Sequence, residues 1–165
     1  VSPVGFAASS LEEAKELARK VTEVTHNHPE GMKAAEATAS AIYLARTEKS
    51  LSELLKFIHE NYYPMDFTLD EIGDSYRFDV TCQGSVPQAF MAFFASTSFE
   101  DAIRNAISIG GDSDTIAAIC GGIAEAYYGV PDAIRERALT FLDAQLTQIL
   151  TAFESKYPPV TEKAR

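Results

Sequence analysis

Apolar and small residues recur at every third or fourth position along most of the chain, which is the spacing of amphipathic helices. One helix is expected over residues 11–24, with Ser9 or Ser10 as its N-cap, and Ser50 is expected to cap another that begins at Leu51. Further helices are expected over residues 32–46, 86–96, 98–109, 116–128 and 131–153. The pattern therefore predicts an all-α fold.

Three segments add detail to this picture. Residues 32–46 are mostly alanine, serine and other small residues, so this helix can lie close to its neighbours and is expected at the centre of a bundle. Pro87 suits the first turn of the helix expected over residues 86–96. Between residues 62–83 the helical pattern fades, and residues 76–80 alternate as a short extended piece would.

The size and charge of the chain limit its possible partners. Its 165 residues suit a compact multi-helix domain over residues 1–156, followed by a flexible tail at residues 157–165. The net charge of −10 argues against a nucleic-acid surface, although a metal ion or a helix N-terminus could still hold an anionic ligand. Cys82 and Cys120 do not form a disulfide framework, which favours the cytoplasm, and no apolar run reaches the roughly 20 residues needed to cross a membrane. The start at Val1, without Met, indicates a fragment or a processed product.

The strongest candidate site is an acidic turn at residues 110–115, which reads Gly-Gly-Asp-Ser-Asp-Thr. Its two glycines permit backbone conformations closed to other residues and let a ligand approach the main chain. Around a helix N-cap, the oxygens of Asp112, Asp114 and Thr115 can converge on a hard cation such as Mg²⁺, and free N–H groups can bind an anion. Aspartates at an N-cap and in a first turn are also ordinary helix chemistry without any metal. The residues alone leave both interpretations open.

The acidic turn and the helix after it resemble the C-terminal signature of the ADP-ribosylglycohydrolase family. The run Gly-Gly-Asp-Ser-Asp-Thr-Ile-Ala-Ala-Ile at residues 110–119 carries this resemblance, together with Gly121, Ala124, Tyr128 and Gly129. Residues 25–31 resemble a second family segment, and residues 81–89, with their Val-Pro pair, resemble a third. The resemblance covers essentially the whole chain. It implies the C-terminal part of a single all-α ADP-ribosylglycohydrolase-like domain that lacks its N-terminal helices.

The resemblance also implies a centre of two Mg²⁺ ions, with Mn²⁺ as an alternative. Asp112, Asp114 and Thr115 would be metal ligands, and both aspartates would be catalytic. In the family, the other half of the metal site is a Thr-Asp-Asp cluster near the N-terminus, and this sequence contains no Thr-Asp-Asp. Three oxygen ligands on one turn make a weak Mg²⁺ site. The chain alone is therefore expected to be inert unless the missing N-terminal segment associates with it.

The implied activity is metal-dependent hydrolysis of the glycosidic link between ADP-ribose and a protein side chain, or of a related ADP-ribose compound. The residues expected to contact the ADP-ribose are His26, His28, Gly31, Gly110, Gly111 and Ser113. Without the resemblance, the two histidines fit a helix C-terminus, where imidazole can meet the last carbonyls. Two alternatives stand beside the hydrolase: a non-catalytic ADP-ribose-binding or structural, crystallin-like member of the same fold, and an unrelated helical interaction module.

Overall fold

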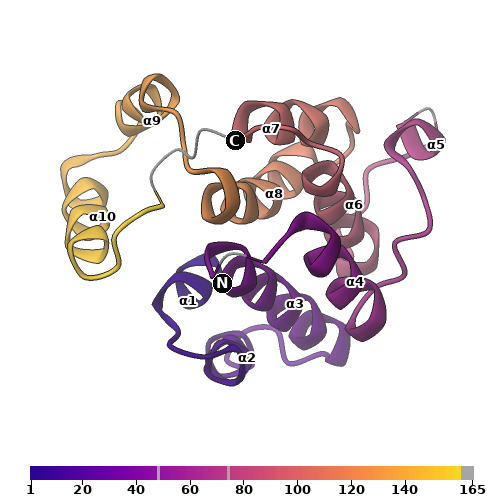
Figure 1. Cartoon of the computed structure of the whole chain (residues 1–165), viewed down its shortest axis with the longest axis horizontal. Coiled ribbons are helices and arrows are strands. Elements are labelled where there is room, and N and C mark those ends of the chain that lie inside the picture. Colours follow the sequence, from indigo (N-terminus) through magenta and orange to yellow (C-terminus); the bar gives the residue numbers. More distant parts are fainter. Residues whose placement is uncertain (48, 74, 161–165) are drawn as a thin grey trace.

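A computed structural model describes residues 1–47, 49–73 and 75–160, and within these ranges the chain is helical and contains no strand (Figure 1). In chain order the helices are α1 Ser2–Ala7, α2 Leu11–Thr22, α3 Pro29–Arg46, α4 Leu51–Asn61, α5 Leu69–Gly73, α6 Cys82–Phe94, α7 Phe99–Ser108, α8 Ser113–Tyr128, α9 Asp132–Leu139 and α10 Ala144–Lys156. The all-α prediction is confirmed. In the described part of the chain, no helix is both long and apolar enough to cross a membrane.

Helices α3 and α8 form the centre of the structure. Helix α3 packs against α1, α2, α4, α6 and α8, and α8 also packs against α1, α6 and α7. Small side chains make this possible, since a Cβ on Gly5 of α1 would lie 2.6 Å from the Ile42 side chain of α3. Ala37 and Ala41 of α3 have no exposed surface. The small-residue helix therefore occupies the central place that its composition predicts.

Helix α6 supplies the aromatic part of the core. Its Phe93 is fully buried, with its ring centroid 5.6 Å from that of Tyr127 and 6.0 Å from that of Tyr128, both on α8. Large rings in such contact dominate the burial of apolar surface. The packing joins the C-terminal end of α6 to the C-terminal end of α8, away from the acidic turn.

Two expectations about the start of α6 were wrong. The helix begins at Cys82, where the Thr81 side chain accepts a hydrogen bond from the N–H of Gly84, and Pro87 lies inside the helix instead of in its first turn. Proline is tolerated there because the carbonyl left without a donor belongs to Gln83, an exposed residue that water can reach. Residues 76–80 form an irregular connection and not an extended strand.

The single helix expected over residues 131–153 is also wrong, because the chain breaks between α9 and α10. The Asp143 side chain accepts a hydrogen bond from the N–H of Leu146 at 2.8 Å and so starts a new helix. Figure 1 shows α9 and α10 together at one side of the structure, and Arg135 of α9 donates to Glu154 of α10. Residues 161–165 of the expected flexible tail lie outside the described residues.

Glu125, in the last turns of α8, should make the stability of the fold sensitive to pH. Burial, with repulsion from Glu154, raises the pKa of its carboxyl, and attraction to Arg135 opposes the rise. An acid whose pKa is higher in the folded state binds more protons when folded, so its contribution to stability is lost as pH rises through that pKa. We expect Glu125→Gln to raise the melting temperature at pH 8 and to change it little at pH 4. Thermal unfolding of both proteins at the two pH values checks this, and equal shifts at both would contradict it.

Candidate functional site

The acidic turn lies between α7 and α8, where the chain changes direction. Gly110 and Gly111 have φ angles of +76° and +60°, in the left-handed region that favours glycine. Asp112 follows as the N-cap of α8. The two glycines thus let the chain enter α8 with Asp112, Asp114 and Thr115 gathered at the helix N-terminus.

The carboxyl groups of Asp112 and Asp114 interact directly. Asp112 makes no capping hydrogen bond with its side chain. A hydrogen bond with Asp112, followed by bonds from the N–H groups of Asp114 and Thr115, holds the pKa of Asp114 below its usual range. Two carboxylates side by side repel each other, and a cation placed between them would remove that repulsion.

The oxygen atoms of the acidic turn suit a hard cation, but there are few of them. Thr115 is exposed and adds a hydroxyl oxygen beside the two carboxyls. Among the described residues, no group of three or more His, Cys, Asp or Glu could hold a metal ion. A cation bound at the acidic turn would therefore have two carboxylates and one hydroxyl from this chain, with its remaining positions left to water, substrate or other ligands.

Main-chain donors stand next to these oxygens. The N–H groups of Gly111, Asp112 and Ser113 make no hydrogen bond within the described part of the chain. Consecutive free N–H groups at the positive end of a helix are suited to a phosphate group. The acidic turn thus combines acceptors for a cation with donors for an anion.

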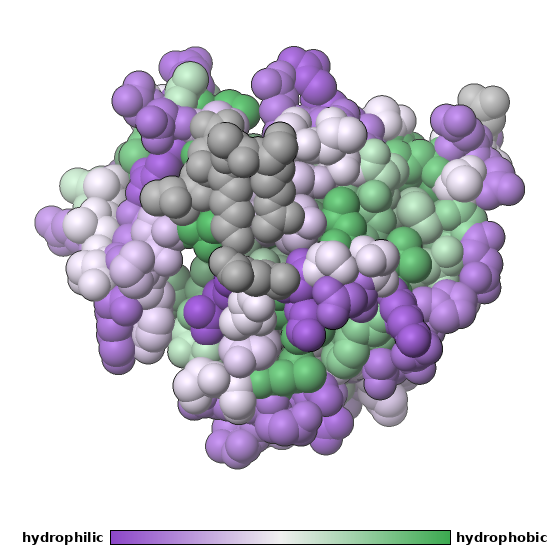
Figure 2. All heavy atoms as spheres, in the orientation of Figure 1, coloured by the Kyte–Doolittle hydropathy of each residue, from purple (hydrophilic) through white to green (hydrophobic). Residues whose placement is uncertain are grey.

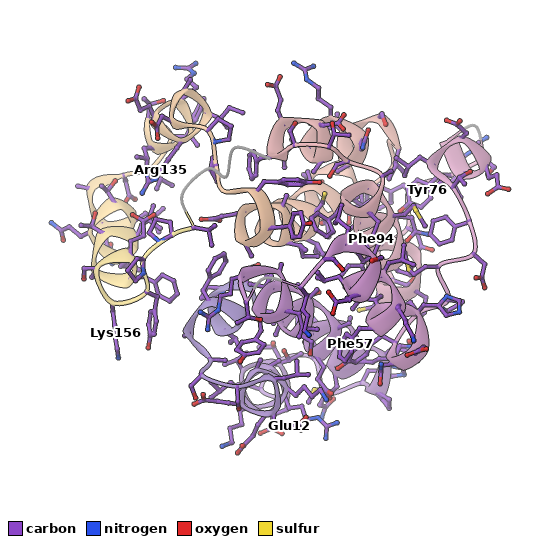
Figure 3. The ribbon with its side chains drawn as sticks, viewed as in Figure 1. Glu12, Phe57, Tyr76, Phe94, Arg135 and Lys156 are labelled. Carbon is purple, nitrogen blue, oxygen red and sulfur yellow. The ribbon has the colours of Figure 1, made fainter. Side chains whose placement is uncertain are left out.

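Tyr76 is a neighbour of the acidic turn that the sequence pattern did not reveal. A Cβ on Gly111 would lie 2.4 Å from its ring, so the ring packs directly against the turn. Its hydroxyl donates to the carbonyl of Gly84 at 2.6 Å, and Figure 3 shows the residue between α5 and α6. Burial, with the nearby charges of Asp79 and Asp112, raises the pKa of Tyr76. The alternation over residues 76–80 does not mark Tyr76 as part of a site, because its contacts join segments far apart in the sequence.

A groove of about 570 Å³ lies next to the first turns of α8. Its walls come from α1, α2, α3, α6 and α8, and Ala118 and Ile119 form the α8 wall. Thr115 is three and four residues before them and so lies on the same face of the helix. His26 lines the groove from the loop between α2 and α3, and Gly31 lines it from the first turn of α3. The structure thus brings His26 and Gly31, two of the residues expected to contact a ligand, to a groove that α8 also lines.

The two histidines have different environments. His26 is exposed, lines the groove, and its Nδ1 lies 2.8 Å from the hydroxyl of Thr25. His28 does not line the groove and is the N-cap of α3, where its Nδ1 accepts a hydrogen bond from the N–H of Glu30 at 3.2 Å. The expectation of a helix C-terminus therefore fails for His28, which begins the next helix.

Comparison with known proteins finds one matching family and several named relatives of this all-helical chain. The sequence profile of the ADP-ribosylglycohydrolase family matches residues 1–159. The human ADP-ribosylhydrolase ARH3 is 26% identical over 176 residues, covering 79% of this chain and 48% of the human protein. The ADP-ribosylarginine hydrolase Tri1 of Pseudomonas putida is 30% identical over 115 residues, covering 65% of this chain and 30% of that protein. A protein of Archaeoglobus fulgidus is 29% identical over 146 residues, covering 74% of this chain and 46% of its own length.

The chain belongs to the ADP-ribosylglycohydrolase family. The match extends over nearly all of it and includes the acidic turn and the loop that carries His26. The chain corresponds to about half the length of the Archaeoglobus and human relatives, 46% and 48% respectively.

Proposed function

We propose that this chain carries one half of the active site of an enzyme that hydrolyses the glycosidic link between ADP-ribose and a protein side chain, or a related ADP-ribose compound. The acidic turn supplies cation ligands, and the groove lined by His26 and Gly31 receives part of the ADP-ribose. The two free thiols are consistent with a cytoplasmic setting. Family membership removes the third hypothesis, an unrelated helical module.

The paired carboxyls of Asp112 and Asp114 carry this proposal. Bringing two like charges together at a surface is unfavourable unless a proton or a cation lies between them. Oxygen ligands of this kind suit Mg²⁺ or Mn²⁺, and we assign Asp112, Asp114 and Thr115 as the ligands from this chain. A bound ion would supply positive charge that activates water and stabilises the charge that develops on the leaving group.

The substrate contacts follow from what surrounds the carboxyls. The free N–H groups of Gly111, Asp112 and Ser113 would receive a phosphate of the ADP-ribose diphosphate. Nothing lies within 4 Å of the position of the missing Cβ of Gly110, so a ligand has room to approach the main chain there. His28 would act indirectly by fixing the start of α3, and His26 is the better placed of the two for ligand contact.

Complete activity requires the other half of the metal site. Family resemblance puts a Thr-Asp-Asp cluster in the N-terminal half of such proteins, and no Thr-Asp-Asp is present among these 165 residues. One hydroxyl and two carboxylates hold Mg²⁺ weakly, and the ion binds better when further oxygen ligands are added. We therefore propose that residues 1–165 hydrolyse nothing alone and become active when an N-terminal half joins them.

A reconstitution assay tests this. ADP-ribosyl-arginine and a peptide with ADP-ribosyl-serine are incubated with the chain alone, and then with the part of the Archaeoglobus relative that the chain does not match. We expect release of ADP-ribose only from the mixture and only with Mg²⁺ or Mn²⁺. Turnover by the chain alone would contradict the requirement for a second half. Tight binding of ADP-ribose by the mixture without turnover would favour the non-catalytic alternative.

A further inference from the structure

A second cavity lies at the opposite end of α8 from the acidic turn, between the body of the structure and the α9–α10 pair. Its volume is about 520 Å³, within the range of pockets that hold small organic molecules. Most of its walls are apolar: Phe99, Val130, Ile134, Leu139, Leu142 and Leu150. Figure 2 shows hydrophobic residues reaching the surface beside the α9–α10 pair, at the left of the view. We call this space the hairpin cavity.

The polar groups of the hairpin cavity are mostly acidic. Its ionisable lining residues are Glu125 on α8, Asp132 and Arg135 on α9, and Glu154 on α10. Three carboxylates against one guanidinium give this lining a net charge of −2 when all are ionised. Within the described residues, no ionisable group lines the cavity from α7 or from residues 157–160.

Glu125 is attracted by Arg135 but forms no salt bridge with it, because the Arg135 guanidinium is bonded to Glu154 instead. Arg135 directs its Nη2 atom to both carboxylate oxygens of Glu154, and Figure 3 shows Arg135 pointing from α9 towards α10. Glu125 makes no hydrogen bond or ion pair with any described residue, although it is only partly exposed. A half-buried carboxylate in apolar surroundings is costly unless it is paired.

We propose that the hairpin cavity binds an organic cation, with a primary ammonium group paired to Glu125 and an apolar body against the surrounding leucines and Phe99. The charge of the lining selects the cation, and the apolar walls select a hydrophobic body over a hydrated inorganic ion. Glu125 and Asp112 are thirteen residues apart on one helix, so the cavity lies about 20 Å from the acidic turn at 1.5 Å per residue. The site is therefore separate from the proposed ADP-ribose site and stands independently of the proposed function.

A matched pair of probes tests the proposal by calorimetric titration of residues 1–165. The amine 4-phenylbutylamine carries the charge, and 4-phenylbutanol has nearly the same shape without it. We expect the amine to bind at least about tenfold more tightly than the alcohol, because a charged hydrogen bond is added to the same apolar contacts. Equal affinity for the two probes, or no binding of the amine at millimolar concentration, would overturn the proposal.

A glutamate-to-glutamine substitution, which removes the charge and keeps the shape, shows which carboxylate binds the amine. Glu125→Gln should weaken binding of the amine about tenfold and leave binding of the alcohol unchanged. Glu136→Gln, on α9 and outside the cavity lining, removes an exposed carboxylate and should leave both affinities unchanged. Thermal unfolding confirms that each variant is folded before titration. Unchanged amine binding in Glu125→Gln, or an equal loss in both variants, would refute the assignment to Glu125.

Discussion

Replacing Asp112 with alanine is expected to abolish the stabilisation of this protein by Mg²⁺ or Mn²⁺. A ligand that binds only the folded state raises the melting temperature of the protein. Removing one of the two carboxylate ligands should weaken binding of the ion on the order of 100-fold or more. Melting temperatures measured across a titration of each ion, for both proteins, provide the test. In the reconstituted enzyme, the same substitution should reduce turnover by at least as much.

The structure also lets this variant decide between a cation site and a simple helix cap. Asp112 makes no capping hydrogen bond, whereas the Asp143 side chain accepts one from Leu146 at the start of α10. Asp143→Ala should therefore destabilise the fold by about 1 kcal/mol and keep its response to the ions. Asp112→Ala should leave the stability of the ion-free fold nearly unchanged and abolish its response to the ions. A loss of stability in Asp112→Ala with no change in the ion response would instead identify Asp112 as a structural residue.

Much of the fold was predictable because its signals are local. The spacing of apolar residues marks α2, α4 and α7, and Ser50 begins α4 with a reciprocal capping box to Glu53. The small residues of α3 indicated its central position before any contact was known. The acidic turn was predictable from adjacent residues too, since two glycines followed closely by two aspartates indicate a tight turn at the start of a helix.

The features that the sequence did not predict depend on competition between neighbouring helix-capping residues or on contacts between segments far apart in the chain. Residues 131–153 carry one apolar pattern, but the side chain of Asp143 competes for main-chain N–H groups and divides them into two helices. Pro87 suggested a helix start, yet Thr81 caps the helix earlier. Tyr76 could not be found at all, because its ring packs against Gly111, thirty-five positions further along the chain.

Gly111→Ala should be much more disruptive than Gly110→Ala, although both glycines have positive φ. Alanine in the left-handed region costs about 1–2 kcal/mol at either position. At Gly110 no atom lies within 4 Å of the new Cβ, so this strain is the whole expected effect. At Gly111 the Cβ would meet the Tyr76 ring at 2.4 Å, and displacing a packed ring adds about 1–3 kcal/mol. Urea unfolding of the two variants measures the difference.

A double-mutant comparison separates the ring contact from the backbone strain. Tyr76→Ala removes the ring, so Gly111→Ala should cost less stability in that background than in the parent protein. Any excess that remains over Gly110→Ala would come from the main-chain carbonyl of Arg77, which lies 3.2 Å from the new Cβ. The ring also ties the turn to α6 through the hydrogen bond from its hydroxyl to Gly84. We therefore expect Gly111→Ala to weaken Mg²⁺ binding more than Gly110→Ala does, since the carboxyls of Asp112 and Asp114 move with the turn. Equal destabilisation by the two alanines in the parent protein would mean that Tyr76 swings away freely and does not position the site.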